Sequence, residues 1–263
     1  MSDTSPVLLE RRGAVHLITL NRPDRLNAID PEMHELLEHT IREADRDDES
    51  RVIVITGAGR GFCAGGDVKG MVGSTSFGKP GRKRVLTAGR DLIDVLVRTE
   101  KPIIAMVNGV AAGLGATIAL FCDIQFMAEE AKIGDRHVNV GLVAGDGGAA
   151  IWPLLIGPSK AKLYLMTGRL IGGTEAAALG LVTRALPADR LEAEVFALAD
   201  ELATLPPYAV QATKASVNRA IAASVGTTLD VSLAYEHLSM HTVDHQEALR
   251  AWSEKRPGNY VGH

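Results

Sequence analysis

A histidine and an aspartate stand nine residues apart in the middle of the chain, as His137 and Asp146. Histidine is the side chain that suits general acid–base catalysis near neutrality, and a carboxylate on its second ring nitrogen would fix the tautomer. Each residue also has a purely structural interpretation. Asp146 could cap the helix that is expected to follow it, and His137 could be a hydrogen-bonded structural histidine. The spacing indicates an acid–base pair and leaves these structural roles open.

Two glycine-rich turns offer a different chemical group, the backbone N–H. They cover residues 61–67 (GFCAGGD) and 108–115 (NGVAAGLG), and each follows a run typical of a buried strand. Unpaired N–H groups at the start of a helix point outward and can donate to an anion or a polarised oxygen. Two such turns brought together would form an oxyanion hole. The alternative is that these glycines only permit positive φ and close packing.

The second turn has a weak likeness to the phosphate-binding turn of a Rossmann dehydrogenase. Such a turn belongs to the first βαβ unit, whereas this one begins after residue 100. No tyrosine stands four residues before a lysine, as that dehydrogenase chemistry requires, and the sequence has neither a G-x-S-x-G elbow nor a Walker A lysine. We therefore expect no redox cofactor and no serine nucleophile.

Two groups of histidines have the residue type of a metal site but not its pattern. His34 and His39 are one residue too far apart to share a helix face as in H-E-x-x-H. His237, His241 and His245 fall on one helical stripe, but no cysteine or carboxylate ligand stands in register with them. A polar or interface face explains this stripe better, and we assign no metal.

The composition is that of an ordinary globular protein. The chain has 263 residues, of which 46% are hydrophobic and 23% charged, with a net charge of -4 and a mean hydropathy of +0.08. The negative charge argues against nucleic acid as a partner. There is no signal-peptide pattern and no apolar stretch long enough to span a membrane. With only two cysteines, Cys63 and Cys122, and no disulfide framework, we expect a cytoplasmic location.

The expected elements that position these groups are those of an α/β fold. Strands are predicted from β-branched runs at 15–20, 52–56, 103–107, 123–128 and 131–134. A helix is predicted over 32–45, with Asp30 as its cap and Pro31 in its first turn. Residues 70–90 read as a mobile loop leading into a helix. After Gly157, Ala-rich helical patterns take over, at 159–167, 174–180, 188–205, 207–223 and 226–254.

Nearly the whole chain resembles the crotonase superfamily, the enoyl-CoA hydratase and isomerase group. The likeness rests on collinear motifs: LNRPDRLNAI from Leu20, VIVITGAGRGFCAGGDVKGM from Val52, KPIIAMVNGVAAGLGATIALFCD from Lys101, GLVAGDGG from Gly141, LMTGRLIGGTEAAALGLV from Leu165 and EKRPGNYVG from Glu254. The resemblance implies an α/β core of stacked ββα units at 1–195. It also implies a helical C-terminal extension at 196–263, through which trimers or dimers of trimers assemble.

The same resemblance implies the binding site. In the family, two backbone N–H groups hold the thioester carbonyl of an acyl-CoA, and the aligned positions are Ala64 and Leu114. Coenzyme A enters as part of the substrate, and it is expected against the segment from Arg25 to Ala28 and the turn of Ala64, Gly66, Asp67 and Val68. Arg25 and Lys255 are its expected basic anchors, Lys255 reaching from a neighbouring subunit.

The likeness fails at the catalytic positions. The two glutamates of true hydratases align with Thr117 and His137, and threonine cannot act as a carboxylate base. A branch similar to 6-oxocamphor hydrolase instead carries the His137 and Asp146-Gly147 pattern followed by Trp152-Pro153. This chain differs from that branch in having Leu114 where the branch has a further histidine, and in keeping the A-G-G-D turn of CoA enzymes.

The resemblance leaves three candidate functions. The first is an enoyl-CoA hydratase-like enzyme that passes through a stabilised enolate, with His137 as acid–base group. The second is hydrolytic cleavage of a C–C bond in a β-keto thioester or β-diketone, in which His137 deprotonates water and Asp146 holds the imidazole. The third is a family member that binds acyl-CoA without catalysis, since Thr117 replaces a glutamate.

Overall fold

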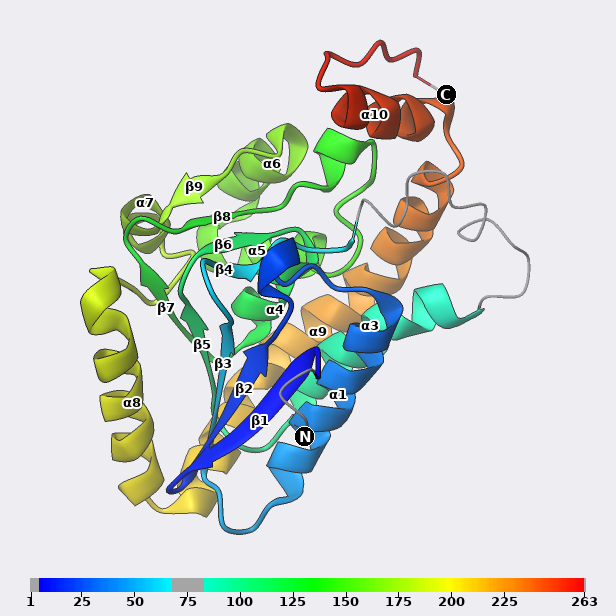
Figure 1. Cartoon of the computed structure of the whole chain (residues 1–263). Helices are drawn as coiled ribbons and strands as arrows, with labels where there is room; N and C mark the ends of the chain where they lie inside the picture. Colours follow the sequence, from blue (N-terminus) through cyan, green and yellow to red (C-terminus); the bar gives the residue numbers. More distant parts are fainter. Residues whose placement is uncertain (1–4, 68–82, 263) are drawn as a thin grey trace.

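A six-stranded sheet lies at the centre of the molecule, between helices (Figure 1). The computed structural model describes residues 5–67 and 83–262. The strand order is β1-β2-β3-β5-β7-β10, and every neighbouring pair is parallel except β1 with β2. The strands are β1 (Val7–Arg12), β2 (Val15–Leu20), β3 (Val52–Gly57), β5 (Ile103–Val107), β7 (Ile124–Ala128) and β10 (Arg184–Leu186). All residues of β3 and β5 are buried, as expected of parallel strands covered on both faces.

A second, four-stranded sheet has the order β4-β6-β8-β9. Its strands are β4 (Gly61–Cys63), β6 (Val110–Ala112), β8 (Lys132–Gly134) and β9 (Ile171–Gly172). Strands β4, β6 and β8 are parallel and follow β3, β5 and β7 directly in the chain. Each of β3, β5 and β7 thus continues into a short strand before a helix or loop, which confirms the predicted stack of ββα units.

Helices cover both faces of this framework. They are α1 (Pro31–Arg46), α3 (Lys83–Arg98), α4 (Leu114–Phe121), α5 (Gly148–Ile156), α6 (Pro158–Thr167), α7 (Gly173–Leu179), α8 (Ala188–Thr204), α9 (Pro207–Ser239) and α10 (Val243–Glu254), with short 3₁₀ turns η1 (Pro23–Arg25) and η2 (His137–Val140). Figure 1 shows α8 on one side of the large sheet, and α1, α3 and α9 on the other. Among the described residues, no helix is both long and apolar enough to cross a membrane.

Helix α1 begins where the sequence predicts. The side chain of Asp30 accepts a hydrogen bond from the backbone N–H of Met33 at 2.9 Å, and Pro31 occupies the first turn. Apolar residues at helical spacing, among them Leu37 and Ile41, are fully buried. The helix therefore owes its start to its cap and its orientation to this apolar face.

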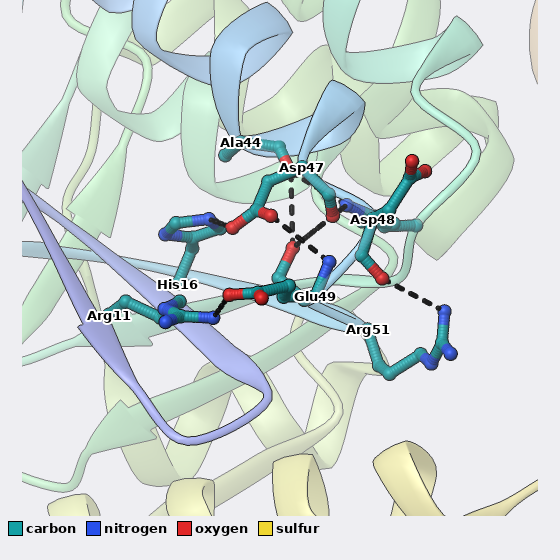
Figure 2. Close-up of polar contacts among 9 residues, drawn as sticks. Arg11, His16, Ala44, Asp47, Asp48, Glu49 and Arg51 are labelled. Carbon is teal, nitrogen blue, oxygen red and sulfur yellow. Dashed lines mark hydrogen bonds and ion pairs between the residues drawn. The ribbon is translucent and has the colours of Figure 1, made fainter.

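A polar cluster ends α1 and leads the chain into β3 (Figure 2). Asp47 Oδ2 lies 2.7 Å from Nε2 of the buried His16, and Asp47 Oδ1 accepts from the N–H of Glu49 at 3.0 Å. The Ser50 hydroxyl donates to the Ala44 carbonyl at 3.2 Å. This turn lies far from the glycine turns, and its contacts join the end of α1 to β2.

The C-terminal helices differ from the sequence prediction in one respect. A break was expected near residues 223–226, but α9 runs unbroken over Pro207–Ser239 and passes through Gly226, where a Cβ would meet no other atom within 4 Å. The break falls instead before Thr242, whose hydroxyl accepts from the N–H of His245 and caps α10. The expected histidine stripe is therefore wrong, since His245 belongs to the next helix.

The expected domain boundary at 195/196 falls inside α8. Leu191, Val195 and Ala199 form one buried face of this helix, which packs against the large sheet. This buried face crosses the expected boundary without interruption. Strand β1, which pairs antiparallel with β2, was not predicted.

Candidate active site

His137 opens the short turn η2, immediately after β8. Its Nδ1 lies 2.8 Å from Oδ1 of Asp135, and the same oxygen accepts the backbone N–H of His137 at 3.1 Å. Asp135 is 1% exposed. This contact places a proton on Nδ1 and orients the ring, so Nε2 is the nitrogen left for chemistry.

Asp146 lies on the Nε2 side of the same ring. Its Oδ2 is 3.3 Å from Nε2 of His137, and its Oδ1 accepts the hydroxyl of Thr117 on α4 at 3.0 Å. Helix α5 has Gly147 at its N-cap and no side-chain cap. The carboxylate of Asp146 therefore contacts His137 and Thr117 and does not cap the helix.

Two glycines hold the backbone of Asp146 in this place. A Cβ on Gly145 would come within 2.5 Å of Cβ and Oε2 of Glu236, and a Cβ on Gly147 within 2.9 Å of Cγ2 of Thr117. Gly147 also has a φ of +121°. The loop can bring Asp146 between α4 and α9 only because both flanking residues lack a side chain.

The charges of this cluster are coupled. Burial opposes the charged form of His137, but the carboxylates of Asp135 and Asp146 more than offset it and raise its pKa well above the usual range. Burial also opposes ionisation of Asp146, yet His137 and the Thr117 hydroxyl hold its pKa below the usual value. At neutral pH the pair is an imidazolium and a carboxylate.

This geometry bears on one role that the sequence suggested. Asp146 was expected to hold the imidazole in the hydrolytic mechanism, with His137 as the base. In the structure Asp135 contacts Nδ1 of the imidazole, and Asp146 is the ionised group that faces Nε2. The only sequence signal for Asp135 is its place two residues before His137, which lets one carboxylate contact both the backbone and the ring.

A fourth group, Glu236 of α9, was also missed. Its Oε1 lies 3.9 Å from Nε2 of His137. Nothing in the sequence links the two, because they are brought together only by the packing of α9 beneath the loop of Gly145.

The two glycine-rich turns meet beside His137. A Cβ on Gly65 would lie 3.5 Å from the nitrogen of Leu114, and a Cβ on Gly113 would lie 3.5 Å from Cε1 of the His137 ring. Leu114 is the first residue of α4, and within the described residues its N–H has no acceptor. This N–H therefore starts a helix next to His137, at the position where one donor of an oxyanion hole is predicted.

The expected second donor requires a correction. The N–H of Ala64 donates to the carbonyl of Leu26 at 2.9 Å and is not available to a ligand. Two residues further on, the N–H of Gly66 finds no acceptor in the part of the chain that the structure describes. Of these two residues, Gly66 and not Ala64 has the N–H that is available to a ligand.

The residues expected around coenzyme A are partly brought together. Arg25 is 57% exposed at its side chain and lies 2.8 Å from Oδ2 of Asp67, while the N–H of Ala28 donates to the Arg25 carbonyl at 3.1 Å. Gly66 forms a bridge with Ile29 beside this turn. Val68 and most of the predicted 70–90 loop lie outside the described residues. Lys255 stands at the other end of the chain, just after α10, in the left-handed conformation that ends the helix.

Asp135, His137 and Asp146 each offer one ligand atom, and these atoms lie within 4.8 Å of one another. Such a group could surround a metal ion. The ion pair itself accounts for the closeness, since both ring nitrogens of His137 face carboxylate oxygens. Oδ2 of Asp135 is buried without a hydrogen-bond partner among the described residues, but this single oxygen does not by itself make a metal site, and we assign no metal.

The fold and this site define a class of α/β proteins. In this class, two glycine-rich turns of successive ββα units meet beside a cluster of ionisable side chains. Residues 10–263 match the family model described as enoyl-CoA hydratase/isomerase. The chain belongs to this family. It is 34% identical to the 1,2-epoxyphenylacetyl-CoA isomerase of Escherichia coli over 97% of this chain and 98% of the relative. It is 32% identical to the short-chain-enoyl-CoA hydratase of Clostridium acetobutylicum over 95% of each.

The solved structures agree with the sequence relatives. An enoyl-CoA hydratase/isomerase from Mycobacterium paratuberculosis superposes with a TM-score of 0.86 at 37% identity, covering 93% of this chain and 97% of the other. The relatives include both isomerases and hydratases, so family membership fixes the class of enzyme and leaves the reaction to be argued from the site.

Proposed function

We propose that this protein is an acyl-CoA enzyme that adds water to, or removes it from, a carbon–carbon double bond next to the thioester. The observation that carries this proposal is the position of the Leu114 N–H, which starts a helix beside the His137 and Asp146 pair. A thioester carbonyl held by Leu114 and Gly66 would place its α and β carbons toward this pair.

The two N–H groups would stabilise the enolate oxygen that forms when water adds to the double bond. Donors fixed in a buried site stabilise such a charge strongly because they need no reorganisation. The pair of His137 and Asp146 would carry the protons, with the Asp146 carboxylate as the acceptor. This arrangement performs acid–base chemistry without a metal or a redox cofactor.

Coenzyme A would lie along the turn of Arg25, Ala28 and Asp67. The exposed guanidinium of Arg25 supports this assignment, since a phosphate could share it with Asp67 or displace Asp67 from it. We retain Lys255 as a second anchor, supplied by a neighbouring subunit. Val68 is retained from the family motif alone.

The C-terminal helices support assembly into trimers or dimers of trimers. Large apolar side chains remain exposed on α6, on α9 and beyond α10, including Met166, Leu238 and Val261. A second copy of the chain would bury them. The mass of the particle in solution, measured by light scattering, tests this assembly. We keep the cytoplasm as the proposed location, to be checked by cell fractionation.

Cleavage of a C–C bond is the main alternative reaction. In the form expected from the sequence, it needs His137 as the base. The structure instead gives His137 two carboxylate partners that keep it protonated, and this favours the hydratase. The substrates for hydration and for C–C cleavage are nevertheless both included in the test.

The test incubates the protein with a crotonyl-CoA series and with a β-keto-acyl-CoA series in water labelled with heavy oxygen, followed by mass spectrometry. We expect the label in a 3-hydroxyacyl-CoA. Label in a released carboxylate would establish the hydrolase instead. If neither series reacts but both bind, the protein is an acyl-CoA-binding member of the family.

A further inference from the structure

Nε2 of His137 stands between two carboxyl groups that come from distant parts of the chain. Oδ2 of Asp146 lies 3.3 Å away and Oε1 of Glu236 lies 3.9 Å away. The side chains of His137, Asp146 and Glu236 are each 11% exposed. All three therefore keep a small accessible surface in an otherwise buried cluster.

The packing of α9 holds the Glu236 carboxyl close to Asp146. Oε2 of Glu236 lies where a side chain on Gly145 would be, and the hydroxyl of Ser232, one turn earlier on α9, donates to the Gly145 carbonyl at 2.8 Å. Helix α9 therefore contacts the loop that carries Asp146 through two side chains one turn apart. Ser232 makes a neutral hydrogen bond, and Glu236 brings an ionisable carboxyl group.

The two carboxyl groups differ in protonation. Burial raises the pKa of Glu236 to about 8, and the negative charges of Asp146 and Asp135 add to this effect against the opposing influence of His137. Asp146 is held in its ionised form by His137 and Thr117. Within the described residues, the titratable groups that act on Glu236 are His137 of η2, Asp135 before it and Asp146 before α5. At neutral pH Glu236 carries a proton and Asp146 does not.

We propose that Asp146 and Glu236 are the base and the acid of the reaction, and that His137 returns the proton between them. This inference rests on the acyl-CoA function proposed above and names the groups that perform it. Two titratable groups with pKa values pushed apart by their surroundings are a general pattern for acid–base catalysis. Asp146 and Glu236 therefore supply the two carboxyl groups that are missing at Thr117 and His137, the positions that align with the glutamates of hydratases.

The protons and electrons balance in three steps. Asp146 takes a proton from water as the water oxygen bonds to the β-carbon, and the electron pair of the double bond moves into the enolate. Glu236 gives its proton to the α-carbon, where the enolate electron pair forms the new C–H bond. His137 then gives its Nε2 proton to Glu236 and takes the proton of Asp146, which restores the site with one water consumed.

The first experiment compares Glu236→Gln with Ser232→Ala in the full-length protein, using crotonyl-CoA as the probe. Both variants alter the contact between α9 and the Gly145 loop, but only the first removes an ionisable group. We expect Glu236→Gln to lower kcat by on the order of 10²–10⁴, with little change in KM. Wild type should lose activity above about pH 8 as Glu236 ionises, and Ser232→Ala should keep this profile. Equal losses in both variants would show a structural role and overturn the proposal.

The second experiment does not depend on turnover. Infrared difference spectra across alkaline pH should show the loss of a protonated carboxyl band in wild type, and this band should be missing from Glu236→Gln. If the band persists in the variant, the proton is not on Glu236 and the proposal fails. If wild type shows the band but does not hydrate crotonyl-CoA or any member of the series, the hydratase function fails and the protonation of Glu236 stands.

Discussion

Oδ1 of Asp135 lies 2.8 Å from Nδ1 of His137 and also accepts the backbone N–H of the same residue. One carboxylate oxygen thus fixes both the backbone and the ring of the histidine. This relationship determines which ring nitrogen faces Asp146 and Glu236.

Asp135→Asn should therefore impair the enzyme more than a surface change of the same type. The amide can still accept from the backbone N–H, but it no longer carries the charge that holds the ring protonated at Nδ1. We expect kcat for crotonyl-CoA hydration to fall by about 10²-fold or more. The matched control is Asp48→Asn, at the exposed turn of Figure 2. Similar kcat values for the two variants would remove Asp135 from the mechanism.

Leu114→Pro should abolish most activity, whereas Leu114→Ala should be tolerated. Proline is accepted in the first turn of a helix, so the substitution at the start of α4 removes the N–H without breaking the helix. The loss of one such donor costs about 2.7–4 kcal/mol in the transition state. Circular dichroism checks that both variants are folded. Comparable kcat values for the two would contradict the role of this N–H.

Thr117→Val should shift the acid limb of the pH–rate profile to higher pH, and Thr117→Ser should not. The hydroxyl donates to Asp146 and contributes to the lowering of its pKa. Without it, Asp146 accepts a proton more readily and stops acting as a base at a higher pH. The valine variant should also lose roughly 0.5–1.5 kcal/mol of stability from the missing hydrogen bond. An unchanged acid limb in the valine variant would show that the hydroxyl does not tune Asp146.

Glu236→Gln should be more stable than wild type at alkaline pH. The folded-state pKa of Glu236 is raised by burial to about 8, above the ordinary value of about 4.3 for glutamate in an unfolded chain. Wild type therefore loses stability as pH rises between these two values, because the unfolded chain ionises first. Glutamine does not ionise, so the advantage of the variant should be absent in acid and full above the folded pKa. Urea unfolding of both proteins in acid and above the folded pKa measures this advantage. A difference in unfolding free energy that is the same at both pH values would be inconsistent with a protonated Glu236.

Arg25→Ala and Lys255→Ala should weaken the binding of acyl-CoA, and each should reduce its dependence on salt. Both side chains are expected to meet phosphate groups, whose attraction is screened by ions. Arg11→Ala, which removes an exposed ion pair with Glu49 (Figure 2), is the control. Calorimetry with acetyl-CoA at two salt concentrations gives the affinities. If all three variants bind as wild type does, the phosphates are held elsewhere.

The sequence by itself determined the framework of the protein. Strand β2 and helix α1 follow from local patterns, a β-branched run over Val15–Leu20 and a cap with apolar spacing after Asp30. The two glycine turns and the spacing of His137 and Asp146 are also local, since each depends on residues close together in the chain. Such features could be predicted because short-range physics fixes them.

The tertiary structure decided which of these groups are available to a ligand and which are already hydrogen-bonded within the protein. Whether Ala64 or Gly66 offers a free N–H depends on the Leu26 carbonyl, which a separate turn brings to Ala64. Which nitrogen of His137 is free depends on the fold of the segment around Asp135, and Glu236 enters the site only through the packing of α9. Hydrogen bonds and charges act through space and compete for the same atoms, and that competition is settled only when distant segments come together.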